Sequence, residues 1–218
     1  LLASLNPQQR KAVTAPHGQV LVLAGPGSGK TRVLTYRIAY LVKEQGVKPS
    51  NILAVTFTNK AAREMQARVE RLLDKEVKGI WLGTFHSICA RILRREVEYL
   101  PVKNNFVIFD DDDQIGLVKK AIRELNIDEK THRPVSVHAA ISRAKNDLRL
   151  PDGLVANSYR EEVVKRVYER YQQMLIANNA VDFDDLLLYT AILLEDHKQV
   201  CEAYGRRFEH ILVDEFQD

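Results

Sequence analysis

The chain has 218 residues, which is enough for one large domain or two small domains with a buried core. Its composition, 45% hydrophobic and 28% charged, is that of an ordinary globular protein, and no apolar run approaches the roughly 18–20 residues that a membrane-spanning helix needs. The net charge of +3 fits a nucleic-acid partner, but it is too small to indicate one by itself.

The two cysteines and the chain ends bear on the setting of the protein. Cys89 and Cys201 lie far apart, without a Cys-x-x-Cys pair or a histidine cluster, which argues against a disulfide framework and a zinc site. We therefore expect a reduced, cytoplasmic setting.

The N-terminus lacks the pattern of a signal peptide. The chain begins at Leu1 and stops at Asp218, directly after a strand pattern, so we expect a fragment of a longer protein.

Strand and helix patterns alternate through the first half of the chain. Residues 19–24 (QVLVLA) form a short apolar run before a Gly-rich turn, which is typical of a buried strand. A helical period follows over 33–42, and a second buried-strand pattern over 52–57 leads into another helix. Further strands are expected at 80–84 and 106–109. This alternation predicts right-handed βαβ crossovers and an α/β fold with a parallel sheet.

After Asp110 the pattern becomes helical. Apolar stripes over 115–125 and 164–174 predict helices, and Leu150-Pro151-Asp152-Gly153 interrupts them. The α/β character returns with a helix from about Asp184 and a strand at 210–213. We therefore predict three segments: 1–109 and 181–218 form the α/β domain, and 110–180 is an inserted, all-helical subdomain.

The segment Ala24-Gly25-Pro26-Gly27-Ser28-Gly29-Lys30-Thr31 follows one predicted strand and opens a helix. In this context the backbone N–H groups of the loop and of the helix N-terminus point at one spot and cradle phosphates. Lys30 is expected to reach the β- and γ-phosphates of ATP, and the Thr31 hydroxyl is expected to bind Mg²⁺. The first position is Ala24 rather than glycine, so only the looser form of the motif matches. The alternative is a Gly-rich turn with a solvated lysine.

Two acids follow the last predicted strand. Asp214 and Glu215 come directly after residues 210–213, and ligands of open α/β sheets bind at the carboxyl ends of the strands. We expect Asp214 to hold Mg²⁺ through its hydration shell and Glu215 to orient and deprotonate the attacking water. The alternative is that both acids cap or solvate a loop.

These motifs, taken in order, resemble the UvrD/Rep/PcrA family of superfamily 1 DNA helicases over essentially the whole chain. The matching segments are LNPQQRKAV (5–13), AGPGSGKTRVL (24–34), VTFTNKAAREM (55–65), GTFHSICARILR (83–94), DFDDLL (182–187) and DEFQD (214–218). The resemblance implies a RecA-like P-loop domain, called 1A, that carries an inserted helical subdomain, called 1B.

The resemblance also implies roles for individual residues. Gln9 matches a glutamine that reads the adenine edge, and Arg32 matches an arginine packed on the adenine face. Gln217 and Asp218 match residues thought to couple the γ-phosphate to the DNA site. A further set matches segments that contact single-stranded DNA: Phe57, Asn59, Lys60, Thr84 and His86. Aromatic faces stack on any base and lysine neutralises phosphate, so part of this set also makes physical sense.

The parent protein is then expected to move 3′→5′ along single-stranded DNA, to act at junctions of single- and double-stranded DNA, and to serve repair or replication. Motors of this kind need arginines from a second RecA-like domain, each worth about 10³–10⁵ in rate. We therefore expect residues 1–218 to bind nucleotide weakly and to have almost no ATPase activity. Two alternatives remain open: the motor part of a RecB/AddA-type nuclease–helicase, and a nucleotide-gated DNA-binding module without turnover.

Other acidic and aromatic groups have structural interpretations. We expect Asp110 to Asp113 and the acids at 182, 184 and 185 to cap helices rather than to bind metal. Arg91, Arg94 and Arg95 are as compatible with a solvated helix face as with DNA contact. Tyr168 and Tyr171 are expected in the core.

Overall fold

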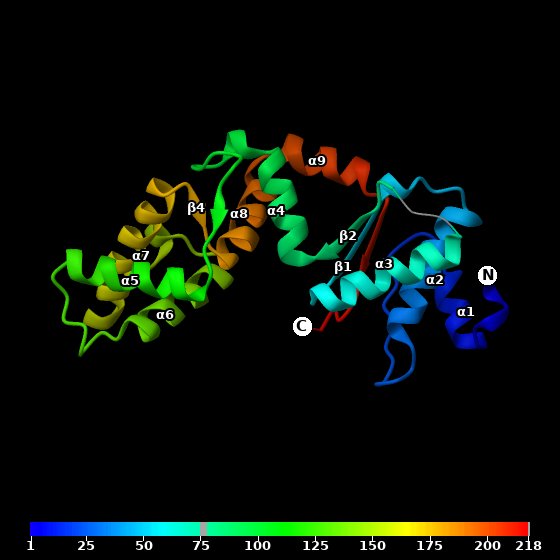
Figure 1. The fold of residues 1–218 in the computed structure, drawn as a ribbon, viewed down its shortest axis with the longest axis horizontal. Coiled ribbons are helices and arrows are strands. Elements are labelled where there is room, and N and C mark those ends of the chain that lie inside the picture. The colour runs from blue at the N-terminus through cyan, green and yellow to red at the C-terminus, as the bar shows by residue number, and fades with distance from the viewer. Residues whose placement is uncertain (75–77, 218) are drawn as a thin grey trace. The chain divides into compact units, whose positions relative to one another are not determined.

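The structure is a computed structural model and describes residues 1–74 and 78–217 (Figure 1). The chain divides into two compact units. The first unit comprises Leu1–Ile88 together with the segment from Glu202 onward, and the second comprises Cys89–Cys201. In the part of the chain that the structure describes, no helix combines the length and the apolar character needed to cross a bilayer.

The first unit is an α/β domain. Its elements are α1 (Pro7–Val13), α2 (Lys30–Lys43), β1 (Ile52–Thr56), α3 (Asn59–Leu73), β2 (Trp81–Thr84) and β5 (His210–Val213), with the start of α4 (Phe85–Arg95), the end of α9 (Lys198–Arg207), and short 3₁₀ turns η1 (Leu2–Ser4) and η2 (Pro49–Asn51).

A three-stranded parallel sheet with the order β2-β1-β5 forms the centre of this unit (Figure 1). Leu53 of β1 pairs with Trp81 on one side and with Ile211 on the other. Helix α3 makes the crossover from β1 to β2, as parallel strands require. The predicted α/β fold with a parallel sheet is confirmed, and so are the strands expected within 52–57, 80–84 and 210–213. The core includes side chains from α2, α3 and the sheet: Ile38, Leu41, Ile52, Met65, Val69 and Leu212.

The strand predicted at residues 19–24 is absent from the structure. These residues have no regular secondary structure, and the side chains of Val20 to Leu23 are 41–86% exposed. They face β5 across a cavity instead of pairing with it. An apolar run indicates that burial would be favourable, but a strand exists only once its backbone has a pairing partner. The sequence pattern could not show whether that partner is engaged.

The second unit is largely helical. Its elements are most of α4, the start of α9, η3 (Val97–Tyr99), β3 (Val107–Ile108), α5 (Asp111–Glu124), α6 (Pro134–Asn146), η4 (Pro151–Gly153), α7 (Tyr159–Ala177), β4 (Ala180–Val181) and α8 (Phe183–Asp196). The strand expected at 106–109 is present as β3. Among the described residues it pairs only with β4, in parallel, and β4 was not predicted from the sequence. With two residues each, β3 and β4 are too short for a periodic signal.

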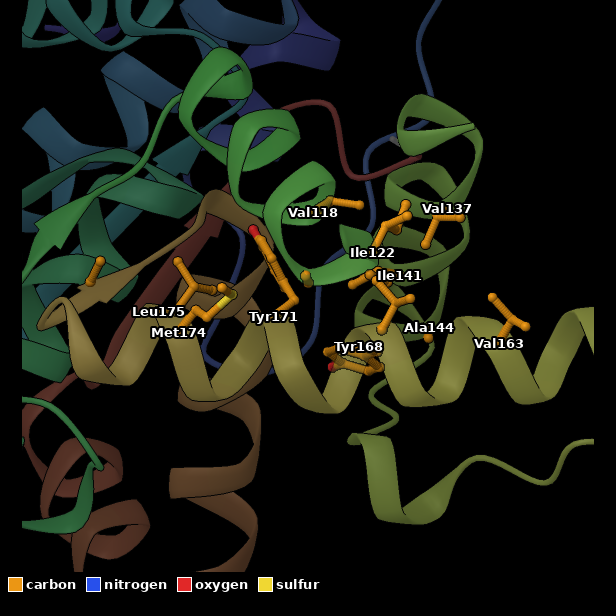
Figure 2. Packing of buried hydrophobic residues seen from close by; sticks show 13 residues of the cluster. Val118, Ile122, Val137, Ile141, Ala144, Val163, Tyr168, Tyr171, Met174 and Leu175 are labelled. Atoms are coloured by element: carbon orange, nitrogen blue, oxygen red, sulfur yellow. The ribbon is translucent and has the colours of Figure 1, made fainter. Parts of the chain in front are cut away.

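Helices α5, α6 and α7 enclose the core of this unit. Figure 2 shows Ile122 from α5 and Ile141 from α6 lying beside the face of α7 that carries Tyr168 and Tyr171. Both tyrosines are fully buried, which confirms their predicted place in the core. The predicted caps are also confirmed: Asp110 forms a capping box with Asp113 at the start of α5, and Asp182 forms one with Asp185 at the start of α8.

The compact helical unit is wider than the helical segment expected from sequence. Both predicted boundaries, after 109 and after 180, lie inside Cys89–Cys201. Two long-range contacts tie residues beyond the predicted boundaries to the helical segment. The β3–β4 pair joins the residues before α5 to those after α7, and Lys145 of α6 contacts both Asp182 and Asp185 of α8.

Gly83 on β2 packs under the first turn of α4. A Cβ at Gly83 would clash with Ser87 Oγ, and that hydroxyl donates to the Thr84 carbonyl (2.9 Å). We expect Gly83→Ala to lower the free energy of unfolding by about 1–3 kcal/mol, the usual cost of overpacking. Adding Ser87→Ala should recover much of this loss, because the clashing oxygen is then gone. Urea denaturation followed by the fluorescence of Trp81, buried in the same unit, measures both variants. Unchanged stability of Gly83→Ala would contradict the prediction.

Candidate functional site

The Gly-rich loop ends where α2 begins. Gly29 is the N-cap of α2, with φ = +88°, and Gly27 has φ = +74°. A residue with a Cβ would pay roughly 1–2 kcal/mol for this left-handed conformation, so both positions require glycine. No side chain caps α2, and the N–H groups of its first turn therefore remain directed toward the loop. A helix N-terminus of this kind attracts an anion.

Two side chains of the loop bond to the loop's own carbonyl oxygens. Lys30 Nζ donates to the carbonyls of Ala24 (3.2 Å) and Gly25 (3.5 Å). Ser28 Oγ donates to the carbonyl of Gly25 (2.7 Å), and Pro26 lies exposed at the turn. The lysine ammonium is a point charge on a flexible stem, so it can exchange these carbonyl acceptors for phosphate oxygens.

Thr31 and Asp214 meet although 183 positions separate them in the chain. Thr31 Oγ1 donates to Asp214 Oδ2 over 3.1 Å, and Asp214 is only 5% exposed. The Asp214 N–H donates to the Val55 carbonyl (2.9 Å), which extends the β1–β5 ladder by one bond and fixes the position of the acid. The start of α2 and the end of β5 thus bring two side-chain oxygen atoms to one point.

Lys30 and Asp214 line the same cavity. It has a volume of about 1010 Å³ and lies along β5, with residues 17–23 on its other side. Glu215 and Gln217 also contribute to its wall. The four residues predicted to be catalytic therefore line one cavity, whereas the other residues predicted to bind nucleotide are not part of its wall.

Glu215 has a strained backbone at the end of β5. Its φ of +54° lies in the left-handed region, which is uncommon for a residue other than glycine. Gln217 Nε2 donates to Glu215 Oε2 over 2.5 Å, so the amide holds the carboxylate close to the chain. Asp218 lies outside the described residues.

The expected adenine-contacting residues lie beside the loop. Gln9 Nε2 donates to the Ser28 carbonyl (3.0 Å), while Gln9 Oε1 accepts from the Asn6 N–H (3.2 Å) in the capping box of α1. The Arg32 guanidinium donates to the Ser4 carbonyl (2.9 Å) and lies 5.3 Å from the Tyr36 ring centroid.

The residues expected to contact DNA follow the carboxyl ends of β1 and β2. Phe57, Asn59 and Lys60 come directly after β1, and Phe57 is 59% exposed. Thr84 ends β2 and pairs in register with Thr56 of β1. Because Val55 also pairs with Val213 of β5, the carboxyl ends of all three strands meet at one edge of the sheet.

Thr84 and His86 differ from Phe57 in their surroundings. Thr84 is buried, and its hydroxyl accepts from the Ser87 N–H (3.2 Å) at the start of α4. The side chain therefore acts as a helix cap in the structure. His86 lies in the first turn of α4 and is partly exposed.

A family model described as the UvrD/REP helicase N-terminal domain matches residues 5–218. The chain belongs to this family. The family indicated by the sequence motifs is therefore confirmed.

Curated relatives agree with the family. The ATP-dependent DNA helicase PcrA of Bacillus subtilis (strain 168) is 49% identical over 220 residues, which cover 100% of this chain and 30% of that protein. The helicases of the same name from Staphylococcus epidermidis (strain ATCC 35984) and Staphylococcus aureus (strain Mu50) are 47% and 46% identical, with the same coverage. The chain thus spans 30% of the length of these relatives.

Two further side chains, not predicted from the sequence, support the candidate site of this UvrD/REP domain. Asn6 fixes the Gln9 side chain through the capping box, and the pattern Asn-Pro-x-Gln was a visible signal for that box. Tyr36 lies one turn after Arg32 and shares a hydrogen bond with Ser4 Oγ (2.9 Å). This bond is the main cause of the lowered pKa of Tyr36, and the neighbouring Arg32 adds to it. The i, i+4 spacing of Arg32 and Tyr36 was the available signal.

Proposed function

We propose that this chain is the ATP-binding, N-terminal part of an ATP-dependent DNA helicase that moves 3′→5′ on single-stranded DNA, in DNA repair or replication. One observation carries the proposal: the hydrogen bond between Thr31 and Asp214, which joins the phosphate loop to the acidic strand end. The relatives named ATP-dependent DNA helicases support it. The substrate is single-stranded DNA and its junctions with duplex, in the cytoplasm, where free thiols such as Cys89 and Cys201 persist.

ATP and Mg²⁺ are the cofactors of the proposed site. Magnesium prefers oxygen ligands and binds through few carboxylates plus substrate phosphates, so the convergent oxygens of Thr31 and Asp214 suit it. The bound ion would neutralise charge that develops on the phosphates. Lys30 and the loop Gly25 to Gly29 would bind the phosphates, and Gln9 and Arg32 the adenine. Glu215, oriented by Gln217, would position and deprotonate water.

The proposed RecA-like fold needs one more strand beside β5. Residues 19–24 are apolar and exposed, and they face the unpaired edge of β5 across the cavity. Pairing there would bury four apolar side chains and satisfy two rows of backbone groups. It would also place Gly25 at the carboxyl edge of the sheet, where ligands of such folds bind. The helices between β3 and β4 would then form the inserted subdomain.

The sheet edge beyond β1 and β2 is the proposed DNA surface. Phe57 is exposed and can stack on a base, while Asn59 and Lys60 start α3, where a helix N-terminus and a cation favour phosphate. Thr84 would act by holding α4, which carries His86. The first unit has 15 basic and 10 acidic residues, so the positive balance of the chain lies in the unit with this edge.

Thr31→Val tests the proposed nucleotide site. This change removes the hydroxyl while keeping the size of the side chain, so we expect Mg²⁺ to lose most of its effect on the affinity for a fluorescent ATP analogue. Fluorescence titrations with Mg²⁺ and with EDTA measure that effect. Thr14→Val, directly after α1, is the control, because the Thr14 hydroxyl donates to the Arg10 carbonyl of the same helix (3.0 Å) and lies outside the proposed site. If Mg²⁺ changes the affinity for the ATP analogue equally in Thr31→Val and in the parent, the proposal is refuted. That result would favour the alternative of a nucleotide-gated DNA-binding module without turnover.

A further inference from the structure

A charged cluster is buried inside the helical unit. Lys145 lies near the end of α6 and is fully enclosed, as are Asp182 and Asp185 at the start of α8. Lys145 Nζ donates to Asp182 Oδ2 (2.6 Å) and to Asp185 Oδ1 (2.7 Å). One cation thus faces two carboxylates in a region without solvent.

Three tyrosines, uncharged at neutral pH, and one further acid lie around the cluster. From α7, the Tyr171 hydroxyl donates to Asp182 Oδ2 (2.7 Å) and the Tyr168 ring lies 5.7 Å from Lys145 Nζ. Burial is the main cause of the raised pKa of both tyrosines, and the carboxylates add to it. The pKa of Tyr189 of α8 is also raised, mainly by burial, and the Asp185 carboxylate adds to this shift. Asp184, the remaining acid on the first turn of α8, is partly exposed and lies 3.4 Å from Asn146 Nδ2. With both buried carboxylates ionised, the cluster therefore carries one uncompensated negative charge.

Gln172 of α7 completes the cluster and has an unused acceptor. Its Nε2 donates to both oxygens of Asp185 (3.1 and 3.2 Å) and to the Tyr189 oxygen (2.7 Å). Its Oε1 is buried and has no hydrogen-bond partner among the described residues. A buried carbonyl oxygen without a partner is costly, and this one belongs to the amide that contacts Asp185.

We propose that this cluster is a proton-linked switch in the helical unit, in which Asp185 takes up one proton from solvent and donates it in a hydrogen bond to the Gln172 amide oxygen. In the ionised state the amide presents its N–H₂ group to the carboxylate, as in the structure. In the protonated state the amide rotates: the bonds from Nε2 to Asp185 and Tyr189 break, the amide oxygen accepts from the Asp185 carboxylic acid and from the Tyr189 hydroxyl, and the N–H₂ group moves to the position that Oε1 leaves. Proton uptake leaves a balanced Lys145–Asp182 ion pair.

The balance of forces at Asp185 favours this uptake at mildly acidic pH. Burial raises the pKa of Asp185 to about 6; the attraction of Lys145 opposes this shift and the repulsion of Asp182 adds to it. Because the pKa in the folded state lies above the ordinary value of 3.8, the folded state binds this proton more tightly than the unfolded state does. The contribution of this group to stability is complete below pH 3.8 and is lost as the pH rises through 6.

Carbon-13 NMR of the aspartate carboxyl groups in the 218-residue chain tests the proposal. We expect one carboxyl resonance to titrate near pH 6, and we expect it to be missing in Asp185→Asn. Asp184→Asn is the matched control on the same helical turn, and it should keep this resonance. If every aspartate titrates below pH 5, or if the resonance persists in Asp185→Asn, the proposal is wrong.

The stability of the same variant gives a second readout. Asparagine mimics the neutral acid, and its N–H₂ group can donate to Gln172 Oε1. We therefore expect the urea midpoint of Asp185→Asn, relative to that of the parent, to rise between pH 5 and pH 7 and to stay level above pH 7. If the difference in urea midpoint between Asp185→Asn and the parent is the same at pH 5 and pH 7, the proposed switch is wrong. An aspartate that only caps the helix would give such a pH-independent difference.

Discussion

Replacing Lys30 with alanine is expected to weaken the binding of Mg²⁺-ATP strongly. The Lys30 ammonium already reaches over the loop to the carbonyls of Ala24 and Gly25, and it lines the same cavity as Asp214. Hydrogen bonds to charged groups are worth about 1.5–3 kcal/mol, which corresponds to about 10- to 150-fold in the dissociation constant. Isothermal titration calorimetry with a non-hydrolysable ATP analogue measures this loss.

Lys11→Ala is the matched control for this experiment. Lys11 lies on the exposed face of α1, outside the cavity, and its loss changes the net charge of the chain by the same amount. If both variants bind nucleotide as tightly as the parent, the Gly-rich loop is not a phosphate site. Equal weakening in both variants would indicate a general charge effect instead of a contact.

Replacing Lys145 with methionine is expected to cause the largest loss of stability. The variant leaves Asp182 and Asp185 buried without their cation, although methionine fills most of the space. Breaking a buried ion pair by removing one partner costs about 3–5 kcal/mol. The loss should be smaller near pH 5 than at pH 8, because a protonated Asp185 reduces the unpaired charge.

Urea denaturation followed by circular dichroism measures this loss, since most of the helical unit depends on α6, α7 and α8. Lys120→Met is the control: Lys120 is exposed on α5, and surface substitutions usually change stability by less than about 0.5 kcal/mol. If Lys145→Met is as stable as this control, the cluster does not hold α6 to α8.

Much of the candidate site was visible in the sequence, because its signals are local. The Gly-rich loop was predicted between an apolar run and a helix, and in the structure Gly27 and Gly29 have the positive φ that glycine adopts easily. The acids at 110–113 and 182–185 predicted helix caps, because a carboxylate one residue before a helix accepts its free N–H groups. The parallel sheet followed from the alternation of apolar strands and amphipathic helices.

Other features could not be predicted from the sequence, because they depend on contacts between residues far apart in the chain. The pairing of β3 with β4 joins segments about 70 residues apart, and neither strand is long enough to show a period. Residues 19–24 are as apolar as β1, yet they remain unpaired, because pairing depends on the edge of β5 and not on composition. Lys145 lies in an ordinary helical pattern, and only the packing of α6 against α8 shows that its ammonium is buried.

The sequence by itself determined the Gly-rich loop, the acidic strand end, the helix caps and the UvrD-type motifs, since each depends on neighbours within a few residues. The tertiary structure alone decided that Thr31 and Asp214 meet across 183 positions and that two helix-capping aspartates share a buried lysine. The physical reason is that backbone conformation and capping are short-range, whereas hydrogen bonds between elements depend on how those elements pack.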